Sequence, residues 1–357
     1  MRSTTPKFVI ILTQDTKNIS VQQIANALRR NIDSNYQVLI WDVNTVRFSG
    51  NNLVQNDRFF QASGVPLSDI VFAIKRTWSS IRSKSLAICQ GLETHGISVF
   101  NGCEFIEWSH SKIKQFKTSS DLFPNTVCFD AEFMQSVQNK EHDEIVQDVI
   151  ATVGTELQFP VVFKTNEGCR GDGIFLVHTK NDLISLMRKM LSDPTKEFKN
   201  GFLLQEFIST HTDPFISNYY RINLVGGRAQ SAVQFQMLWK KTADGFYKLS
   251  DFPEANDMPV DVNSFPAEKL NEIVRRCPGK VDGIGIDVVM DTSGKLLLLE
   301  YNDGPVVSQI VSLGEKFSTM PACAKAAMAC VAFPDEIAKR CIPELSKKHR
   351  LLLNSKL

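Results

Sequence analysis

The feature that most constrains the fold is a pair of apolar runs separated by a short polar turn. Residues 283–290 read GIGIDVVM and residues 295–302 read KLLLLEYN, with Asp-Thr-Ser-Gly between them. Apolar runs around such a turn are typical of an antiparallel β-hairpin. Because side chains alternate between the faces of a strand, Glu300 and Asn302 should share one face, with two leucines behind them.

Folding about the turn would bring Asp287 on the first strand near Glu300 on the second. The hairpin would then carry two carboxylates and the amide oxygen of Asn302 on an apolar surface. Hard oxygen donors of this kind suit Mg²⁺, which commonly accompanies phosphate groups. The other interpretation is a strand with an exposed polar end, but the spacing of all three residues favours a metal site.

Composition is that of an ordinary globular protein with more than one domain. The 357 residues are 43% hydrophobic and 22% charged, with a formal net charge of +1, so a nucleic-acid or membrane partner is not predicted. No apolar stretch reaches about 18 residues, so no transmembrane helix is expected, and the N-terminus does not resemble a signal peptide. The eight cysteines are scattered without zinc-binding spacing, which predicts reduced thiols and a cytoplasmic location.

Alternating apolar runs and amphipathic segments predict three units. The first, residues 1–108, should be a small α/β domain with a parallel sheet and no dinucleotide site, because no GxGxxG follows its first strand. A middle lobe is predicted over residues 109–198, and a larger C-terminal lobe with a helical tail over residues 199–357.

A lysine at the end of a buried strand precedes a glycine-rich loop. Lys164 is followed by Glu167, Gly168, Gly171 and Gly173 before a second strand returns. Glycines allow backbone N–H groups to approach phosphate oxygens, and a lysine neutralises them as a point charge. It is not a Walker A loop, because no Gly-Lys-Ser/Thr opens a helix. Taken alone, this segment favours an ordinary hairpin.

Two later strands carry polar groups that could bind a nucleotide. The strand ending in Gln205, Glu206, Phe207 and Ile208 can present backbone groups to an adenine edge. Arg221 lies in an apolar strand, where burial is costly unless an anion pairs with it. Its planar guanidinium suits a phosphate or carboxylate, although a structural salt bridge explains it equally well.

The order of these motifs along the chain resembles that of the ATP-grasp superfamily. The motifs are the strand with Lys164, the glycine-rich loop, the Gln-Glu-Phe-Ile segment, the strand with Arg221, and Asp287 with Glu300-x-Asn302. Over residues 8–310 the chain is most similar to the RimK-type carboxylate–amine ligases. The resemblance implies an α/β protein with α+β lobes, in which an ATP-grasp fold follows an N-terminal Rossmann-like pre-ATP-grasp domain.

The resemblance also implies roles for individual residues. Mg²⁺, with Mn²⁺ as the alternative, would bind to Asp287, Glu300 and Asn302. Arg221 would be the catalytic residue that stabilises the transferring phosphoryl group and the oxyanion. The ATP-binding residues would be Lys112, Lys164, Glu167, Gly168, Gly171, Gly173, Gln205, Glu206, Phe207, Ile208 and, toward the ribose, Asp213.

The implied reaction forms an amide or peptide bond. A substrate carboxylate attacks the γ-phosphate of ATP to give an acyl phosphate and ADP, and an amine then displaces phosphate. The partners would be a carboxylate and an amine, each an amino acid or peptide, with a homo-oligomer left open. The loop over residues 166–173 would close as a lid that excludes water.

Several positions depart from the RimK-type pattern. Tyr219 stands two residues before the strand arginine, where the family usually has an aspartate. Tyr247 lies where the family has an Arg-Ser-Asn segment, so Lys248 or a neighbouring lysine would supply the missing cation. Asp172 adds a negative charge to the phosphate loop. These departures concern the substrate class more than the nucleotide.

Two other functions stay open. A kinase on the same fold, similar to the inositol phosphate kinases, would phosphorylate a hydroxyl group and should carry more basic residues in its acceptor pocket. A non-catalytic ATP-binding module would bind the nucleotide without a reaction. Retention of Asp287, Glu300 and Arg221 argues against the module.

Overall fold

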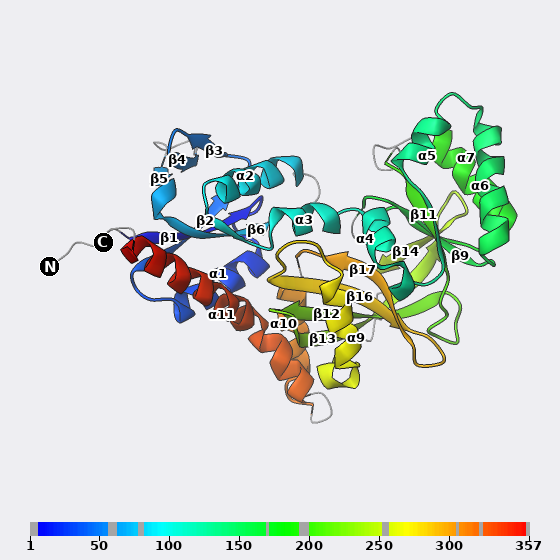
Figure 1. Cartoon of the computed structure of the whole chain (residues 1–357). Helices are drawn as coiled ribbons and strands as arrows, with labels where there is room; N and C mark the ends of the chain where they lie inside the picture. The colour runs from blue at the N-terminus through cyan, green and yellow to red at the C-terminus, as the bar shows by residue number, and fades with distance from the viewer. Residues whose placement is uncertain are drawn as a thin grey trace.

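The computed structural model describes residues 6–55, 63–77, 82–168, 171–192, 200–251, 257–304, 307–320 and 324–354. A parallel α/β unit at the N-terminus lies on one side of the molecule, and a long mixed sheet builds the rest (Figure 1). Within the described residues, no helix combines the length and the apolar character needed to cross a bilayer.

The N-terminal unit contains a four-stranded parallel sheet in the order β2-β1-β6-β7. The bounds of its main elements are β1 (Lys7–Thr13), α1 (Ile19–Asn31), β2 (Tyr36–Asp42), β6 (Ile70–Arg76), α2 (Arg82–Thr94) and β7 (Ser98–Phe100). The parallel sheet and its helices agree with the α/β arrangement predicted for this part of the chain. The Rossmann-like assignment and the three domain boundaries stay predictions.

A small antiparallel sheet between β2 and β6 was not predicted. It consists of β3 (Val46–Ser49), β4 (Asn52–Gln55) and β5 (Ser63–Pro66). Its strands are only four residues long and mostly exposed on one side, so they carry too little apolar periodicity to be recognised in a sequence.

The long sheet has the order β17-β16-β12-β13-β14-β10-β9-β11-β8, with β15 paired to β13. The strand bounds are β8 (Thr126–Phe129), β9 (Val161–Thr165), β10 (Ile174–Val177), β11 (Phe202–Glu206), β12 (Ile216–Val225), β13 (Arg228–Lys241), β14 (Tyr247–Asp251), β15 (Met258–Val260), β16 (Gly283–Met290) and β17 (Leu296–Asn302). The helix bounds are α3 (Cys103–Ser109), α4 (Lys112–Ser119), α5 (Ala131–Ser136), α6 (His142–Glu156), α7 (Lys180–Ser192), α9 (Ala267–Arg275), α10 (Val307–Phe317) and α11 (Ala324–Asn354).

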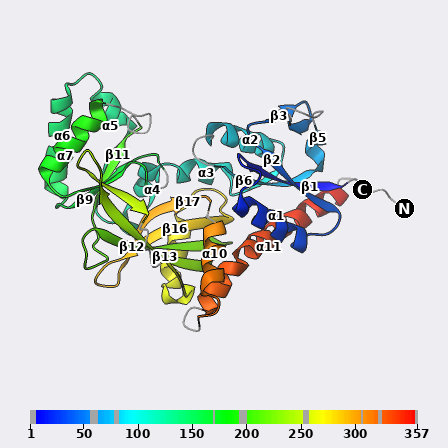
Figure 2. The same ribbon diagram turned by 180° about the vertical axis from the view of Figure 1, so that it is seen from behind.

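Strands β9 and β11 separate an apolar face from a polar one. Phe163 and Phe202 pack with residues of α6 and α7 in one hydrophobic core, and Figure 2 shows these helices on the outer face of that part of the sheet. Since side chains alternate along a strand, Lys164 and Gln205 point to the opposite face. The period-2 pattern thus places the lysine on the side away from the helices.

The predicted hairpin is present, but a β-bulge changes which residues share a face. Asp287 pairs with Glu300, whereas the next residue, Val288, pairs with Leu298. The extra residue on β17 shifts the alternation, so Leu298 and Tyr301 lie buried in the core while Glu300 stays on the other face. Simple alternation would have put Leu298 and Glu300 on the same face.

The C-terminal helix α11 joins the two parts of the molecule. It packs against α1 of the N-terminal unit and against α10 and β13 of the long sheet (Figures 1 and 2). At the same junction, Arg340 of α11 contacts the buried carboxylate of Asp282, with 3.0 Å between Nε and Oδ1. Asp282 also accepts a hydrogen bond from the backbone N–H of Asn101, which follows β7.

The cysteines match the predicted pattern where they can be described. Six of them are free thiols, and Cys89, Cys103, Cys330 and Cys341 are buried. The remaining two, at positions 169 and 323, lie outside the described residues.

Candidate active site

Three neighbouring strands bring an arginine and two carboxylates into register. Arg221 of β12 stands opposite Asp287 of β16, which in turn stands opposite Glu300 of β17. The Arg221 guanidinium binds Asp287 through two hydrogen bonds, Nε to Oδ1 at 2.7 Å and a terminal nitrogen to Oδ2 at 2.6 Å. Asn302 lies beside them, 3.3 Å from Oδ2 of Asp287. The structure therefore gathers the three predicted metal ligands around Arg221.

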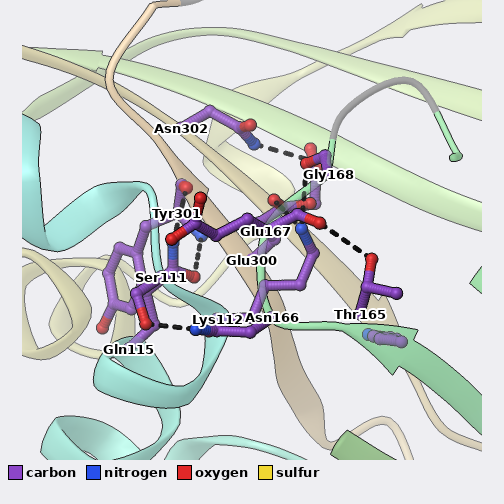
Figure 3. Close-up of polar contacts among 12 residues, drawn as sticks. Ser111, Lys112, Gln115, Thr165, Asn166, Glu167, Gly168, Glu300, Tyr301 and Asn302 are labelled. Carbon is purple, nitrogen blue, oxygen red and sulfur yellow. Dashed lines mark hydrogen bonds and ion pairs between the residues drawn. The ribbon is translucent and has the colours of Figure 1, made fainter. Parts of the chain in front are cut away.

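Lys112, at the N-terminus of α4, reaches the same carboxylates from another part of the chain. Its Nζ atom lies 3.1 Å from Oε1 of Glu300 and donates to the carbonyl oxygen of Gly168, also at 3.1 Å (Figure 3). The side chain is almost fully buried. Lys112 thus connects the predicted phosphate loop to the predicted metal strand.

Lys164 is buried at the end of β9 and hydrogen-bonds to the predicted adenine hinge. Its Nζ atom donates to Oε1 of Gln205 at 2.7 Å, and Nε2 of Gln205 donates to Thr126 at 2.9 Å. Burial lowers the pKa of Lys164, Glu300 opposes the shift and Lys112 adds to it, and the resulting pKa is about 8. Lys164 would therefore lose its charge at mildly alkaline pH.

The charges of this site are paired with one another. Lys112 binds Glu300, and Arg221 binds Asp287. Burial alone would lower the pKa of Arg221, but the Asp287 carboxylate outweighs that effect and raises it. Because Lys164 adds a third cation to two carboxylates, the cluster carries a net positive charge while Lys164 is protonated. Such a cluster favours a polyanionic ligand.

The donor set fits a magnesium ion. The carboxylates of Asp287 and Glu300 project from paired positions of β16 and β17, the Asn302 amide lies next to Asp287, and Mg²⁺ prefers carboxylate and amide oxygens. Across the described residues, no group of three or more His, Cys, Asp and Glu side chains could hold a metal ion. A metal here would therefore depend on Asn302 as its third protein ligand.

The glycine loop packs tightly on Thr165. A Cβ atom at Gly173 would lie 2.1 Å from the Thr165 hydroxyl oxygen, and one at Gly168 would lie 2.8 Å from the carbonyl oxygen of Asp172. Gly171 and Gly173 also have φ angles of 78° and 73°, which disfavour other residues. The backbone of Glu167 accepts a hydrogen bond from Thr165. Residues 169 and 170 of this loop lie outside the described residues.

Two of the departures from the family pattern are paired with each other. Nζ of Lys248 lies 2.9 Å from Oδ1 of Asp172, in a partly exposed ion pair between β14 and the loop. The negative charge that Asp172 adds to the phosphate loop is thus offset by Lys248. The lysine is therefore placed at the loop, beside the predicted phosphate site.

The predicted hinge borders an apolar cluster. Val162, Leu176 and Trp239 are buried together, and Phe207 packs edge-on against the Trp239 ring. Glu206 is exposed, and its N–H donates to Asn125 of the segment before β8. Ile208 follows Phe207 and is partly buried. An adenine ring would need such apolar walls beside free backbone groups.

The side chain of Asp213, the predicted ribose contact, forms a hydrogen bond within a local turn. Its Oδ1 atom accepts a hydrogen bond from the backbone N–H of Phe215 at 2.8 Å, and the side chain is exposed. This turn leads the chain into β12. A ribose contact would use the other carboxylate oxygen, and that role stays a prediction.

Tyr219 gives Arg221 an aromatic neighbourhood in place of an acidic one. The Tyr219 ring stacks on Phe235 of β13 with 5.3 Å between centroids, and the Arg221 guanidinium lies 5.9 Å from the Phe235 ring. Burial raises the pKa of Tyr219 well above its usual value, so this residue stays neutral. Arg221 therefore has one described carboxylate partner, Asp287.

Sequence reasoning missed two buried amides beside Lys112. Asn166 follows β9 and Gln115 lies one turn along α4, and both hydrogen-bond to the backbone of other segments. An asparagine in a glycine-rich loop looks like a turn residue, and a glutamine in a basic helix looks solvent-exposed. The only available signal was their spacing, two residues after Lys164 and three after Lys112.

Comparison with known proteins identifies the fold. A family model described as the RimK-like ATP-grasp domain matches residues 134–237. The solved structure of D-cycloserine synthetase DcsG has a TM-score of 0.60 at 14% identity, covering 94% of this chain and 99% of that chain. D-alanine–D-alanine ligase from Bacillus anthracis complexed with ATP has a TM-score of 0.57 at 13% identity, covering 96% and 99%.

A third structure, the ATP-grasp ligase PsnB complexed with precursor peptide PsnA2 and AMPPNP, has a TM-score of 0.53 at 14% identity, covering 93% of this chain and 99% of that chain. No curated protein matches the chain in sequence. The chain therefore has the ATP-grasp fold, and its segment 134–237 matches the RimK-like ATP-grasp domain. The predicted resemblance is confirmed, whereas the reaction must be argued from the site.

Proposed function

We propose that this protein is an ATP-dependent carboxylate–amine ligase that forms an amide or peptide bond through an acyl phosphate. The observation that carries the proposal is the register of Arg221, Asp287 and Glu300 across three adjacent strands, with Lys112 and Lys164 facing them. A passive nucleotide-binding module has no need for an arginine held on one predicted metal ligand with a second carboxylate directly behind it. The ligase structures named above, which share this fold, support the same reading.

Asp287, Glu300 and Asn302 would hold Mg²⁺, which when bound supplies positive charge between phosphate oxygens. Lys164 and Lys112 would hold phosphate oxygens from the middle of the sheet and from α4. Glu206, Phe207 and Ile208 would border the adenine, as the resemblance implies.

Binding of the nucleotide would exchange ion-pair partners. Lys112 and Arg221 now bind Glu300 and Asp287, at distances of 3.1 and 2.6 Å. A cation and a polyanion entering together would let each carboxylate and each basic side chain find a new opposite charge. The metal alone would leave the basic side chains without an opposite charge, and the phosphate alone would leave the carboxylates without one. Leaving a buried charge unpaired is costly. We therefore expect ATP and the divalent cation to bind with strong mutual dependence.

In the chemical step, Arg221 would stabilise the transferring phosphoryl group. The substrate carboxylate attacks the γ-phosphorus, the bond to ADP breaks, and negative charge spreads over the equatorial oxygens. Arg221 lies beside the Phe235 ring, which would keep its guanidinium in place when Asp287 binds the metal, so the arginine can stabilise that charge with little reordering. The amine then attacks the acyl carbon and phosphate leaves.

The deciding experiment is incubation of the protein with Mg²⁺, ATP and mixtures of amino acids or short peptides. Phosphate release and mass spectrometry are followed together. ADP with a product that has lost one water between acid and amine supports the ligase. A phosphorylated hydroxyl product instead supports a kinase, and tight ATP binding without turnover supports a binding module. Either of the last two results overturns the proposal.

A further inference from the structure

Asn166 joins the phosphate loop to the helix that carries Lys112. Its Oδ1 atom accepts hydrogen bonds from the Ser111 hydroxyl at 2.8 Å and the Ile113 N–H at 3.0 Å. Its backbone carbonyl accepts the Lys112 N–H at 3.1 Å. On the other side, Nδ2 donates to the carbonyl of Asn200. This side chain therefore ties the N-terminus of α4 and the segment before β11 to the end of β9.

Gln115 ties the same helix to the strand that carries Glu300. Its Oε1 atom accepts the N–H of Tyr301 at 2.9 Å, and its Nε2 atom donates to the carbonyl of Tyr301 at 3.0 Å (Figure 3). Tyr301 lies between Glu300 and Asn302 in the sequence, so the Gln115 amide binds the backbone at the middle of the proposed metal motif. Gln115 is fully buried.

The two amides determine where Lys112 can reach. Helix α4 is only eight residues long, and so short a helix has little stability of its own. Lysine side chains are flexible, so the position of the ammonium group depends on where the backbone is held. Asn166 holds that backbone to the phosphate loop and Gln115 holds it to β17. Both sites need a donor and an acceptor together, which an amide provides.

We propose that Asn166 and Gln115 are positioning residues that hold Lys112 at a set distance from both the phosphate loop and the metal strand. Through them, nucleotide binding at one side of the site is coupled to the placement of Glu300 and Asn302 at the other. The proposal rests on the proposed function only in that Lys112 binds a phosphate. It assigns neither amide a contact with the substrates.

The test is a double-mutant cycle read out by calorimetry with Mg²⁺ and the non-hydrolysable analogue AMPPNP. Asn166→Ala should weaken binding about tenfold, a typical cost of removing a group that orients a ligand-binding side chain. In the Lys112→Met background the same change should have little further effect, because its action passes through Lys112. Gln115→Met, which keeps the length and volume of the side chain, should behave in the same way.

Asn101→Ala is the matched control. Asn101 is also buried and its side chain bonds the backbones of two segments, at Asp282 and Gly283 and at Asp303, but none of its hydrogen bonds reaches α4. Asn101→Ala should change AMPPNP affinity by the same factor in the wild type and in the Lys112→Met background. Melting curves on every variant identify those that have lost the fold, and Asn166→Asp, which keeps the acceptor and loses the donor, replaces Asn166→Ala if that variant unfolds.

The outcomes separate the two proposals. Substitution of Asn166 or Gln115 could lower AMPPNP affinity by the same factor in the wild type and in Lys112→Met. That result would overturn the positioning role and leave the ligase proposal standing. If Lys112→Met itself leaves AMPPNP affinity unchanged, Lys112 binds no phosphate, and both its role in the proposed function and the positioning role are wrong. Strong coupling to Lys112, without coupling at Asn101, supports the inference.

Discussion

Two aspartate–arginine pairs five residues apart show how the same chemistry serves two purposes. Asp282, just before β16, binds Arg340 of α11 and Lys280, and the backbone N–H of Asn101. Asp287, inside β16, binds Arg221. Both carboxylates are buried, and in both pairs the Nε atom of the arginine donates a hydrogen bond to the aspartate.

The difference lies in what surrounds each pair. Two of the partners of Asp282, Asn101 and Arg340, come from the N-terminal unit and the C-terminal helix, so these contacts hold two parts of the molecule together. Asp287 instead has a second carboxylate, Glu300, directly opposite it and an amide at its side. Placing two carboxylates together costs energy in a folded protein unless cations or a metal offset it. A like-charged neighbour therefore distinguishes the proposed functional pair from the structural one.

The largest expected effect is on turnover when the site loses its second carboxylate. Glu300→Gln keeps the side-chain shape and removes a charged metal ligand, so ligase turnover should fall by about a thousandfold, as for the loss of several kcal/mol of transition-state stabilisation. The melting temperature should fall modestly, because Glu300 is partly exposed and buried Lys112 keeps its hydrogen bond to the Gly168 carbonyl. Phosphate release and melting curves on the same sample check this, and normal turnover would remove Glu300 from the metal site.

The structural pair should show the reverse. Asp282→Asn leaves Arg340 and Lys280 without their shared charge, and losing a hydrogen bond between charged groups costs about 1.5–3 kcal/mol. The carboxylate is 1% exposed, whereas the side chains of Lys280 and Arg340 are 34% and 38% exposed, so solvent offsets part of the loss. Urea unfolding should show the loss, while turnover per folded molecule stays near that of the wild type. A stable protein with lost turnover would mean that Asp282 belongs to the site.

Exchanging each arginine for lysine sharpens the comparison. Arg221→Lys should lower turnover about a hundredfold and leave ATP affinity within a few-fold, because one ammonium cannot reproduce two parallel donors in the transition state. Arg340→Lys is the matched control, with a modest loss of stability and no change in turnover per folded molecule. Equal effects of the two substitutions on turnover would contradict the distinction between the pairs.

The smallest effect concerns the pH dependence at Lys164. Its pKa is lowered to about 8, so the nucleotide-free protein loses this charge as the pH rises through 8. ATP affinity should then fall by up to about tenfold per pH unit above 8, because binding must restore the proton. Calorimetry at pH 8.5 in buffers of different ionisation enthalpy should reveal proton uptake by the wild type and its absence in Lys164→Met.

Stability of the nucleotide-free protein should change in the opposite direction. A lysine whose folded-state pKa lies below the unfolded value of about 10.4 binds fewer protons when folded, so its contribution to stability rises with pH between about 8 and 10.4. Lys164→Met should remove that part of the pH dependence. A wild-type profile identical to that of the variant would mean that Lys164 has an ordinary pKa.

Much of the local structure follows from the sequence alone. The apolar runs at β1, β9 and β16 predicted strands because a buried strand needs apolar side chains on both faces, and the pairing of Asp287 with Glu300 followed from the hairpin turn. The order of the motifs along the chain also resembled that of the ATP-grasp superfamily closely enough to indicate the fold.

Only the tertiary structure decided how distant segments meet. The bulge in β17 that turns Glu300 away from the core depends on packing against β16, which no local pattern reports. The approach of Lys112 to Glu300 depends on hydrogen bonds from Asn166 and Gln115, which join residues up to 186 positions apart. Whether a buried polar side chain is structural or functional depends on the charges that surround it, and those charges come together only when the chain has folded.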